Sequence, residues 1–398
     1  MTDIHRGTTA FKKINAALFI GGFCTFAILW GMQSLLPEIA EEFSVSPALS
    51  SLVQSSTTLS LAITLLIIGA FAHKFDQKHL MTTSLVVSSI LVIFSGFLSS
   101  FGLLIAFRIL QGITLAGIPA VAMAYLANAI EGKSLGFSMG LYISGSSIGG
   151  MTGRIVSGFL TDYFSWNVAV MGVGLISLLA TALFWYLLPK VEKKVVPAQK
   201  QTGMIRSFLS SFKVPGLPYL FLNGFLLSAG FVSLYNYIGF VLMDPPYYLS
   251  QTLVGFIFVV YLVGTFSSTW MGMLSDKYGK GRILKLSISI LFIGGALTLH
   301  PNLWLIVLGI AIFTFGFFGA HSICSSWVSN YGNENNTQAT SIYLFAYYFG
   351  GSVVGTLSGT LFYAVGWSGI VAMIAALAVL SFLSAFRVTI IKKHQQPA

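Results

Sequence analysis

Charged residues are scarce in this chain, and their scarcity argues against a soluble fold. Only 8% of the 398 residues are Asp, Glu, Lys or Arg, whereas 56% are hydrophobic. A soluble domain carries about 25% charged residues, so a chain this apolar lacks the side chains to cover a surface in water. There are only two cysteines, Cys24 and Cys324, and both lie inside apolar stretches. We therefore expect neither a disulfide nor a metal site.

Twelve apolar stretches fill the chain instead, each about long enough to cross a bilayer. A helix of roughly 20 apolar residues matches the ~30 Å hydrocarbon core, where only helices and closed barrels satisfy their backbone hydrogen bonds. The sequence therefore predicts an all-α membrane protein with twelve transmembrane helices. The expected spans are 14–37, 49–72, 79–98, 101–126, 135–160, 167–189, 217–241, 249–272, 283–300, 303–328, 338–363 and 367–389.

The basic residues are distributed asymmetrically about these spans. Of the 21 Lys and Arg residues, all but Arg108 and Arg154 lie on the side of the N-terminus or at the span ends beside it. Loops on the other side carry acidic residues: Glu38, Glu41, Glu42, Asp162 and Asp244. Basic loops face the cytoplasm, so both termini are expected there. The net charge of +10 is thus a signature of membrane topology, and no nucleic-acid partner is expected.

The two halves of the chain resemble each other at an offset of about 203 to 205 residues. The loop 69–75 corresponds to 272–278, and the pair Gly112 and Ala116 corresponds to Gly316 and Ala320. The one long connection divides the chain into an N-terminal six-helix bundle at 1–190, a cytoplasmic linker at 191–216 and a C-terminal six-helix bundle at 217–398. Parallel repeats of this kind are typical of transporters whose substrate path lies between the halves.

Three motifs resemble those of the major facilitator superfamily. Residues 272–282, Gly-Met-Leu-Ser-Asp-Lys-Tyr-Gly-Lys-Gly-Arg, are similar to its cytoplasmic loop motif, and 108–112, Arg-Ile-Leu-Gln-Gly, to its buried motif in the fourth span. Residues 140–150, Gly-Leu-Tyr-Ile-Ser-Gly-Ser-Ser-Ile-Gly-Gly, resemble the antiporter motif of the twelve-span drug:proton antiporter (DHA1-like) branch of bacterial inner-membrane exporters. Two positions depart from these patterns. His73 stands where the first-half loop has an acidic residue, and Ser146 stands where the antiporter motif has proline.

The resemblance implies the major facilitator fold, a multi-pass protein of the bacterial plasma membrane, and proton-coupled efflux of small amphipathic organic compounds by alternating access. The expected partners are a small-molecule substrate, protons and the lipid bilayer, and the protein is expected to be a monomer. We find no enzyme motif and expect no cofactor. Two alternatives stay open at this stage. One is uptake or exchange of an organic anion, and the other is a non-transporting sensor or channel.

A repeat of small residues marks the fifth span. Gly145, Gly149 and Gly153 recur every four residues and therefore share one helix face. Ser146, Gly150 and Gly158 form the adjacent stripe. Small residues let helix backbones approach closely. One interpretation is tight packing, and the other is a dry seam that closes the outer gate between the halves.

Charged side chains form a second group of conformational candidates. The resemblance implies that Asp276, with Lys277 and Arg282, forms a latch on the cytoplasmic side, although the basic residues also set topology. Arg154 follows the glycine repeat inside the fifth span and is expected to snorkel or to take part in gating.

Residues of the first, fourth, seventh and tenth spans line the central cavity in the superfamily. The polar and aromatic candidates there are Trp30, Gln33, Arg108, Gln111, Asn236, Tyr237, His321 and Trp327. Ionisable groups inside spans are costly and usually face a cavity. Arg108 could contact an anionic substrate, or it could hydrogen-bond backbone carbonyls of the first span in a structural role.

No Asp or Glu lies deep in any predicted span, so the sequence offers no obvious carboxylate for carrying protons. His321, in the tenth span, is the deeply placed group that titrates near neutral pH. It is the candidate for a proton relay. The alternative is a structural histidine satisfied within its helix bundle.

Overall fold

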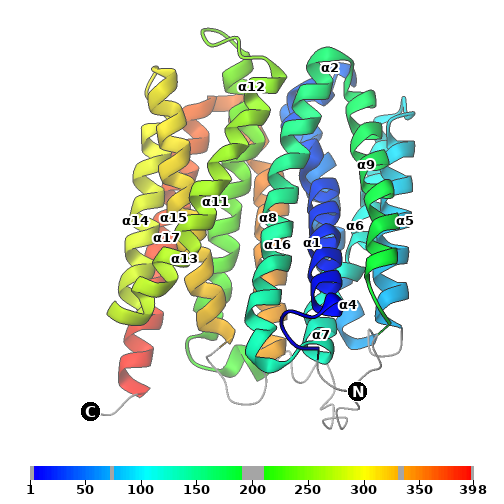
Figure 1. The fold of residues 1–398 in the computed structure, drawn as a ribbon. Helices are drawn as coiled ribbons and strands as arrows, with labels where there is room; N and C mark the ends of the chain where they lie inside the picture. Colours follow the sequence, from blue (N-terminus) through cyan, green and yellow to red (C-terminus); the bar gives the residue numbers. More distant parts are fainter. Residues whose placement is uncertain (1–3, 72–75, 191–209, 330–335, 396–398) are drawn as a thin grey trace. The chain divides into compact units, whose positions relative to one another are not determined.

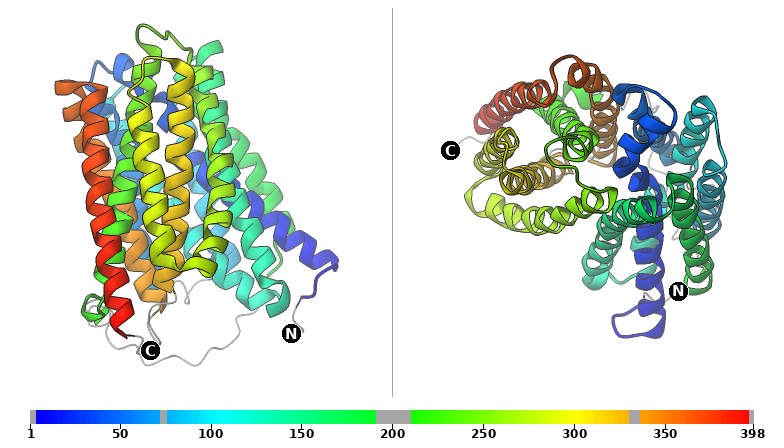
Figure 2. Two further views of the ribbon diagram at one scale, coloured as in Figure 1. Left: turned by 90° about the vertical axis from the view of Figure 1, so that its left-hand side faces the viewer. Right: turned by 90° about the horizontal axis from the view of Figure 1, so that it is seen from above.

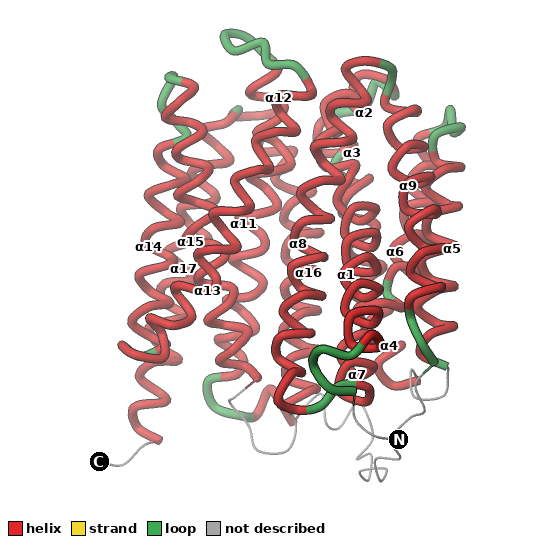
Figure 3. Tube along the Cα trace, in the orientation of Figure 1, coloured by secondary structure: helices red, strands yellow, loops and turns green. Residues whose placement is uncertain are grey.

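The computed structural model describes residues 4–71, 76–190, 210–329 and 336–395. Over these ranges the chain is helical apart from loops and one isolated β-bridge between Ile4 and Ile130 (Figure 3). The helices fall into twelve successive runs, each overlapping one predicted span. In the described ranges, nine are both long and apolar enough to cross a membrane by strict criteria. The predicted all-α membrane fold is confirmed.

Several of the runs are interrupted, so the element count exceeds twelve. The first half contains α1 (Thr9–Trp30), η1 (Gly31–Leu35), α2 (Leu36–Glu42), α3 (Pro47–Ser50), α4 (Leu52–Phe71), α5 (Gln77–Ser95), α6 (Phe101–Leu115), α7 (Gly117–Ala129), α8 (Gly132–Tyr163) and α9 (Trp166–Leu187). The second contains α11 (Leu217–Met243), α12 (Gln251–Phe256), η3 (Ile257–Val260), α13 (Tyr261–Tyr278), α14 (Lys280–Leu297), α15 (Leu303–Ser329), α16 (Asn336–Val365) and α17 (Trp367–Gln395). Their course is traced in Figure 1.

The described residues pack into two compact units, and each unit includes a short segment from the other half of the sequence. Unit 1 comprises Met1–Phe43, Ser56–Lys200 and Ser250–Phe256, within the described ranges. Unit 2 comprises Ser44–Ser55, Gln201–Leu249 and Ile257–Ala398, with the same restriction. Most of the predicted linker, at 191–209, lies outside the described residues.

In unit 1, α8 packs directly on α1 along the predicted glycine face. A Cβ atom at Gly153 would lie 2.6 Å from the carbonyl oxygen of Ala27 in α1. A Cβ at Gly149 would collide with the α1 backbone one turn earlier, and a Cβ at Gly145 with the backbone two turns earlier. Unit 2 repeats this arrangement. A Cβ at Gly350 of α16 would collide with the backbone of Phe225 in α11. Glycine is required at these positions because any side chain would push the helices apart.

The first span is not a continuous α-helix, because α1 gives way to the 3₁₀ turn η1 before α2 begins. Pro37 is at the start of α2. Proline lacks the N–H that would bond the carbonyl four residues earlier, and its ring clashes with that carbonyl. A similar break separates α6 from α7, where Pro119 is the third residue of α7. The breaks leave carbonyl groups in the span interior that other donors must satisfy.

An apolar core fixes α1, α5, α7 and α9 to one another within unit 1. It contains Ile14, Leu85, Ile118 and Phe184, all at most 1% exposed. The helices of each unit are seen nearly end-on in the right panel of Figure 2. This packing supports the buried polar side chains described next.

Candidate functional site

Arg108 is fully buried in α6 and reaches back to the end of α1. Its Nη2 donates to the carbonyl oxygen of Leu29 at 3.2 Å, and its Nη1 donates to that of Ile28 at 3.5 Å and to Oε1 of Gln111 at 2.7 Å. The Nε2 of Gln111 donates in turn to Oγ of Ser95 in α5 at 2.8 Å. The guanidinium thus bonds carbonyls in the last turn of α1, just before the break at η1. These contacts are the ones expected if Arg108 has a structural role and hydrogen-bonds backbone carbonyls of the first span.

Arg154 of α8 lies on the other side of this break. Its Nε and Nη2 both donate to Oε1 of Gln33, at 2.9 and 2.6 Å, and its Nη1 donates to the carbonyl oxygen of Gly150 at 2.7 Å. The guanidinium carbon lies 4.7 Å above the ring of Trp30, a cation–π contact. Two predicted cavity residues and two predicted gating residues therefore form one buried cluster in unit 1. Gln33 belongs to η1, so the broken segment itself supplies the acceptor.

The corresponding polar residues of unit 2 lie where α11 packs on α16. The hydroxyl of Tyr237 donates to the carbonyl oxygens of Gly355 and Thr356, at 2.8 and 3.2 Å. Asn236 is buried, and a Cβ at Gly355 would lie 3.6 Å from its Nδ2. The pair Asn236 and Tyr237 thus occupies the helix interface.

His321 lies in α15 among aromatic rings of α15 and α16. Its Nδ1 and the hydroxyl of Tyr343 share a hydrogen bond of 2.9 Å. The ring of Phe317 is stacked on it at 5.9 Å between centroids, and that of Tyr347 lies at 4.6 Å. His321 is only partly buried, whereas Tyr343 is completely buried. A group of this kind can exchange a proton with the tyrosine hydroxyl and stack against a planar compound.

Trp327 and the predicted loop latch are at the cytoplasmic end of unit 2. Trp327 is buried at the end of α15, with Nζ of Lys392 5.7 Å above its ring. Within the described residues, no ion pair joins Asp276 to Lys277 or Arg282. Instead, Nζ of Lys280 donates to the carbonyl oxygen of Ser326 at 3.1 Å, near the end of α15, and to its Oγ at 2.9 Å. The latch of Asp276, Lys277 and Arg282 stays a prediction.

The first-half counterpart of this loop uses its carboxylate differently. His73 lies outside the described residues, whereas Asp76 is described as the N-cap of α5. Its Oδ1 accepts hydrogen bonds from the backbone N–H of His79 and lies 2.9 Å from the Nδ1 of that ring. The backbone hydrogen bond of His79 lowers the pKa of Asp76 below its ordinary value. Asp76 thus stabilises the start of α5.

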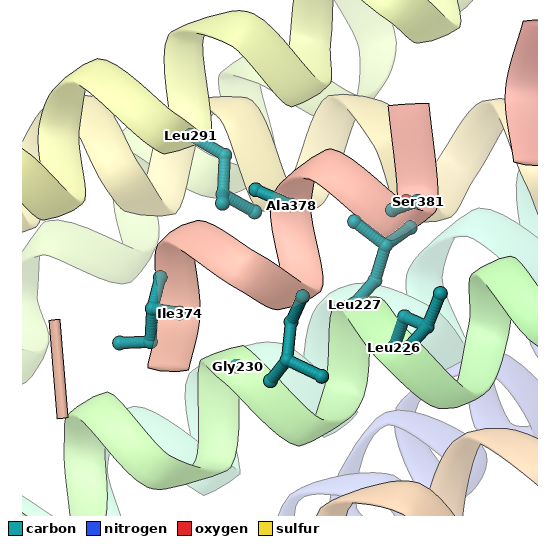
Figure 4. Close-up of a pocket in the computed structure, with 8 residues that line it drawn as sticks. Leu226, Leu227, Gly230, Leu291, Ile374, Ala378 and Ser381 are labelled. Carbon is teal, nitrogen blue, oxygen red and sulfur yellow. The ribbon is translucent and has the colours of Figure 1, made fainter. Parts of the chain in front are cut away.

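A small apolar pocket, with a cavity volume of about 10 Å³, lies between α11, α14 and α17 (Figure 4). Its lining includes Leu227, Gly230, Leu291 and Ile374. Ser381 contributes the one hydroxyl among the lining residues. None of the predicted site residues lines this pocket, and it offers no charged group to orient a substrate.

Sequence reasoning did not single out Tyr343, Tyr347 or a role for Asp162. Tyr343 is 22 residues from His321 on a different helix, and Asp162 bonds residues about 90 positions away. No local spacing rule connects partners so distant. The two tyrosines could have been connected with His321 only by knowing that α15 and α16 are neighbours.

Comparison with known proteins decides the family. The Major Facilitator Superfamily profile matches residues 18–353 and, in a second alignment, 243–398. The chain belongs to the major facilitator superfamily. It is 44% identical over 375 residues to the uncharacterized MFS-type transporter YybF of Bacillus subtilis, covering 94% of this chain and 93% of the relative. It is 40% identical over 380 residues to the inner membrane transport protein YnfM of Escherichia coli, covering 96% and 91%.

More distant similarities agree with this assignment. The chain is 23% identical over 301 residues to a bicyclomycin resistance protein homolog of Haemophilus influenzae, covering 71% of this chain and 74% of the relative. The crystal structure of a bacterial homolog to the human lysosomal transporter Spinster, inward-facing and unoccupied, matches the fold with a TM-score of 0.80 at 16% identity. That match covers 97% of this chain and 98% of the other. The protein is therefore a multi-pass membrane transporter of the secondary type, and not an enzyme.

Proposed function

We propose that this transporter exports small amphipathic organic compounds in exchange for protons. It would do so as a monomer, by alternating access between the six-helix bundles 1–190 and 217–398, which the linker 191–216 connects. Three features support export. They are the antiporter-like motif at 140–150, the similarity to a bicyclomycin resistance protein homolog, and the small number of charged groups in the spans.

The environment of His321 is the observation that carries the proton part of the proposal. His321 shares a hydrogen bond with the Tyr343 hydroxyl through Nδ1, and the ring is partly exposed within unit 2. A neutral imidazole whose Nδ1–H donates to the tyrosine oxygen leaves Nε2 free to bind a proton. Phe317 and Tyr347 beside the ring provide flat apolar surface for a substrate.

The anion-transport alternative has less support. It needs Arg108 as a counter-charge, but the Arg108 guanidinium donates to Ile28 and Leu29 of α1 and to Gln111 of its own helix, α6. Binding a substrate carboxylate would require those hydrogen bonds to be exchanged. A sensor or channel is the remaining alternative, and it is distinguished by counterflow, which a channel cannot perform.

The test uses purified protein in liposomes with a fluorescent amphipathic cation as substrate. We expect counterflow without a gradient, and accumulation driven by an imposed pH gradient. His321→Gln should abolish the stimulation by the pH gradient while retaining counterflow, because glutamine keeps a hydrogen-bonding amide but cannot be protonated at this pH.

His300→Gln is the matched control, because His300 lies in an exposed loop where its Nδ1 accepts a hydrogen bond from the backbone N–H of Asn302. It should behave like the wild type. If His321→Gln transport keeps the wild-type pH dependence, His321 is not the relay. If only organic acids are exchanged, the anion alternative replaces export of amphipathic compounds.

A further inference from the structure

The end of α8 carries a carboxylate that bonds the beginning of the eighth span. Asp162 is the second-last residue of α8, and its Oδ1 and Oδ2 accept hydrogen bonds from the backbone N–H groups of Gln251 and Thr252, at 2.9 and 2.7 Å. The first N–H groups of a helix have no partner within the helix, and a negative charge is favourable there. Asp162 therefore caps α12 from another helix.

The helices α8 and α12 also approach each other closely next to this cap. A Cβ at Gly158 of α8 would lie 2.5 Å from the carbonyl oxygen of Gln251, and one at Gly255 of α12 would lie 3.1 Å from the carbonyl oxygen of Arg154. The side chain of Gln251 is 3% exposed, and neither of its amide atoms has a hydrogen-bond partner among the described residues. A buried amide without partners is costly, so the close contact between α8 and α12 must offset the burial of Gln251.

The eighth span changes its helical form immediately after α12. The 3₁₀ turn η3 (Ile257–Val260) separates α12 from α13, and the boundary between unit 1 and unit 2 falls between Phe256 and Ile257. A stretch of 3₁₀ helix within a longer helix often marks a hinge. The segment 250–256 is thus attached to α8 by the Asp162 cap at its beginning, and it ends at the 3₁₀ turn η3.

We infer that Asp162 is a positioning residue whose carboxylate cap keeps α12 on α8, and that transport requires this cap to release as the eighth span bends at η3. The inference rests on the proposed alternating access. Loss of an N-cap changes a local equilibrium by roughly two-fold to thirty-fold. An interaction of that size can bias a two-state transporter without locking it in one state.

The hydrogen bonds that Asp162 accepts indicate that release of the cap does not depend on its protonation. Partial burial raises the pKa of Asp162, but the hydrogen bonds from Thr252, Ser250 and Gln251 outweigh burial, so that pKa lies below its ordinary value. The cap is therefore intact at neutral pH and is lost only when the pH falls below that value.

The experiment measures whether a buried position under α12 becomes accessible. Val254, which is 2% exposed, is replaced by cysteine in a protein whose Cys24 and Cys324 are replaced by alanine. The reagent is a membrane-impermeant maleimide added to the outer face. Asp162→Asn and Asp162→Ala should each raise the rate of Val254→Cys labelling by on the order of ten-fold. Asp244→Asn, an exposed acidic residue whose side chain caps no helix, should leave the rate unchanged.

A second variant pair tests the need for release directly. Cysteines at positions 162 and 251 are joined by oxidation or by a short thiol cross-linker, and transport is measured in liposomes before and after reduction. Cross-linking should stop transport and reduction should restore it. Undiminished transport by the cross-linked protein, or labelling of Val254→Cys that is unaffected by Asp162→Asn, would overturn the inference. Absence of transport by the uncross-linked wild type would instead contradict the proposed function.

Discussion

At the scale of single residues, the buried arginines show how a span with a break is held together. Arg108 bonds the carbonyls at the end of α1, and Arg154 bonds Gln33 in the 3₁₀ turn that follows. A guanidinium has five N–H donors in a rigid fork, and this geometry suits several fixed acceptors at once. The sequence singled out both arginines, because ionisable groups in apolar spans are conspicuous, and it singled out Gln33 as a polar candidate for the cavity. It left open whether they face substrate or backbone.

Arg108→Lys separates these two roles. Lysine keeps the charge but cannot reach Ile28, Leu29 and Gln111 together, so a structural Arg108 predicts a loss of about 1–3 kcal/mol of stability. We expect a fall of several degrees in the thermal unfolding midpoint in detergent, with the apparent KM of an amphipathic cation little changed. A normal midpoint combined with a large rise in KM for an organic acid would instead indicate a substrate counter-charge.

At the scale of helices, the number and type of the elements could be predicted from the sequence, whereas their partners could not. All twelve runs follow from hydrophobic length alone. Pro37 also indicates that the first span is interrupted between α1 and α2. The face of Gly145, Gly149 and Gly153 was also evident. That this face packs on α1 of the same half depends on tertiary contacts that spacing cannot reveal.

Gly149→Ala tests this close approach. Its Cβ would collide with the backbone of Phe23, so we expect lower thermal stability, and Gly149→Leu should also reduce transport. Gly140→Ala on the same helix is the control, because nothing lies within 4 Å of the Cβ that it adds. Alanine favours a helix over glycine by about 1 kcal/mol, so Gly140→Ala should be neutral or slightly stabilising. Equal unfolding midpoints for the two alanine variants would contradict the packing argument.

At the scale of the whole molecule, the internal repeat is visible in equivalent contacts, although the chemistry of the halves differs. Packing of α8 on α1 is repeated by α16 on α11, and the start of α3 packs on α16 much as α12 packs on α8. However, the buried arginines belong to unit 1, and His321 with its tyrosines belongs to unit 2. The repeat predicted the framework, while residues that break the repeat supply the candidates for substrate and proton binding.

The charge asymmetry makes a prediction about the whole chain in its membrane. Cysteines introduced at Gly7 and at Gln395 should react with an impermeant maleimide only after cells are permeabilised, because both termini are expected in the cytoplasm. A cysteine at Tyr248, in an exposed loop of the opposite side, should react in intact cells. Labelling of Gly7→Cys in intact cells would reverse the orientation, and Asp162 would then lie at the cytoplasmic end.

The exchange of short segments between the two units has a consequence for biosynthesis. Unit 1 needs Ser250–Phe256 to cover Gly158 and to satisfy the Asp162 carboxylate, yet the ribosome makes this segment only after all of the first half. Until then, the newly inserted first bundle carries an exposed glycine surface at the end of its longest helix. If the chain were divided in the linker and expressed as two fragments, each fragment would lack the short segment that its unit takes from the other half. The fragments would therefore reach their final form only when produced together.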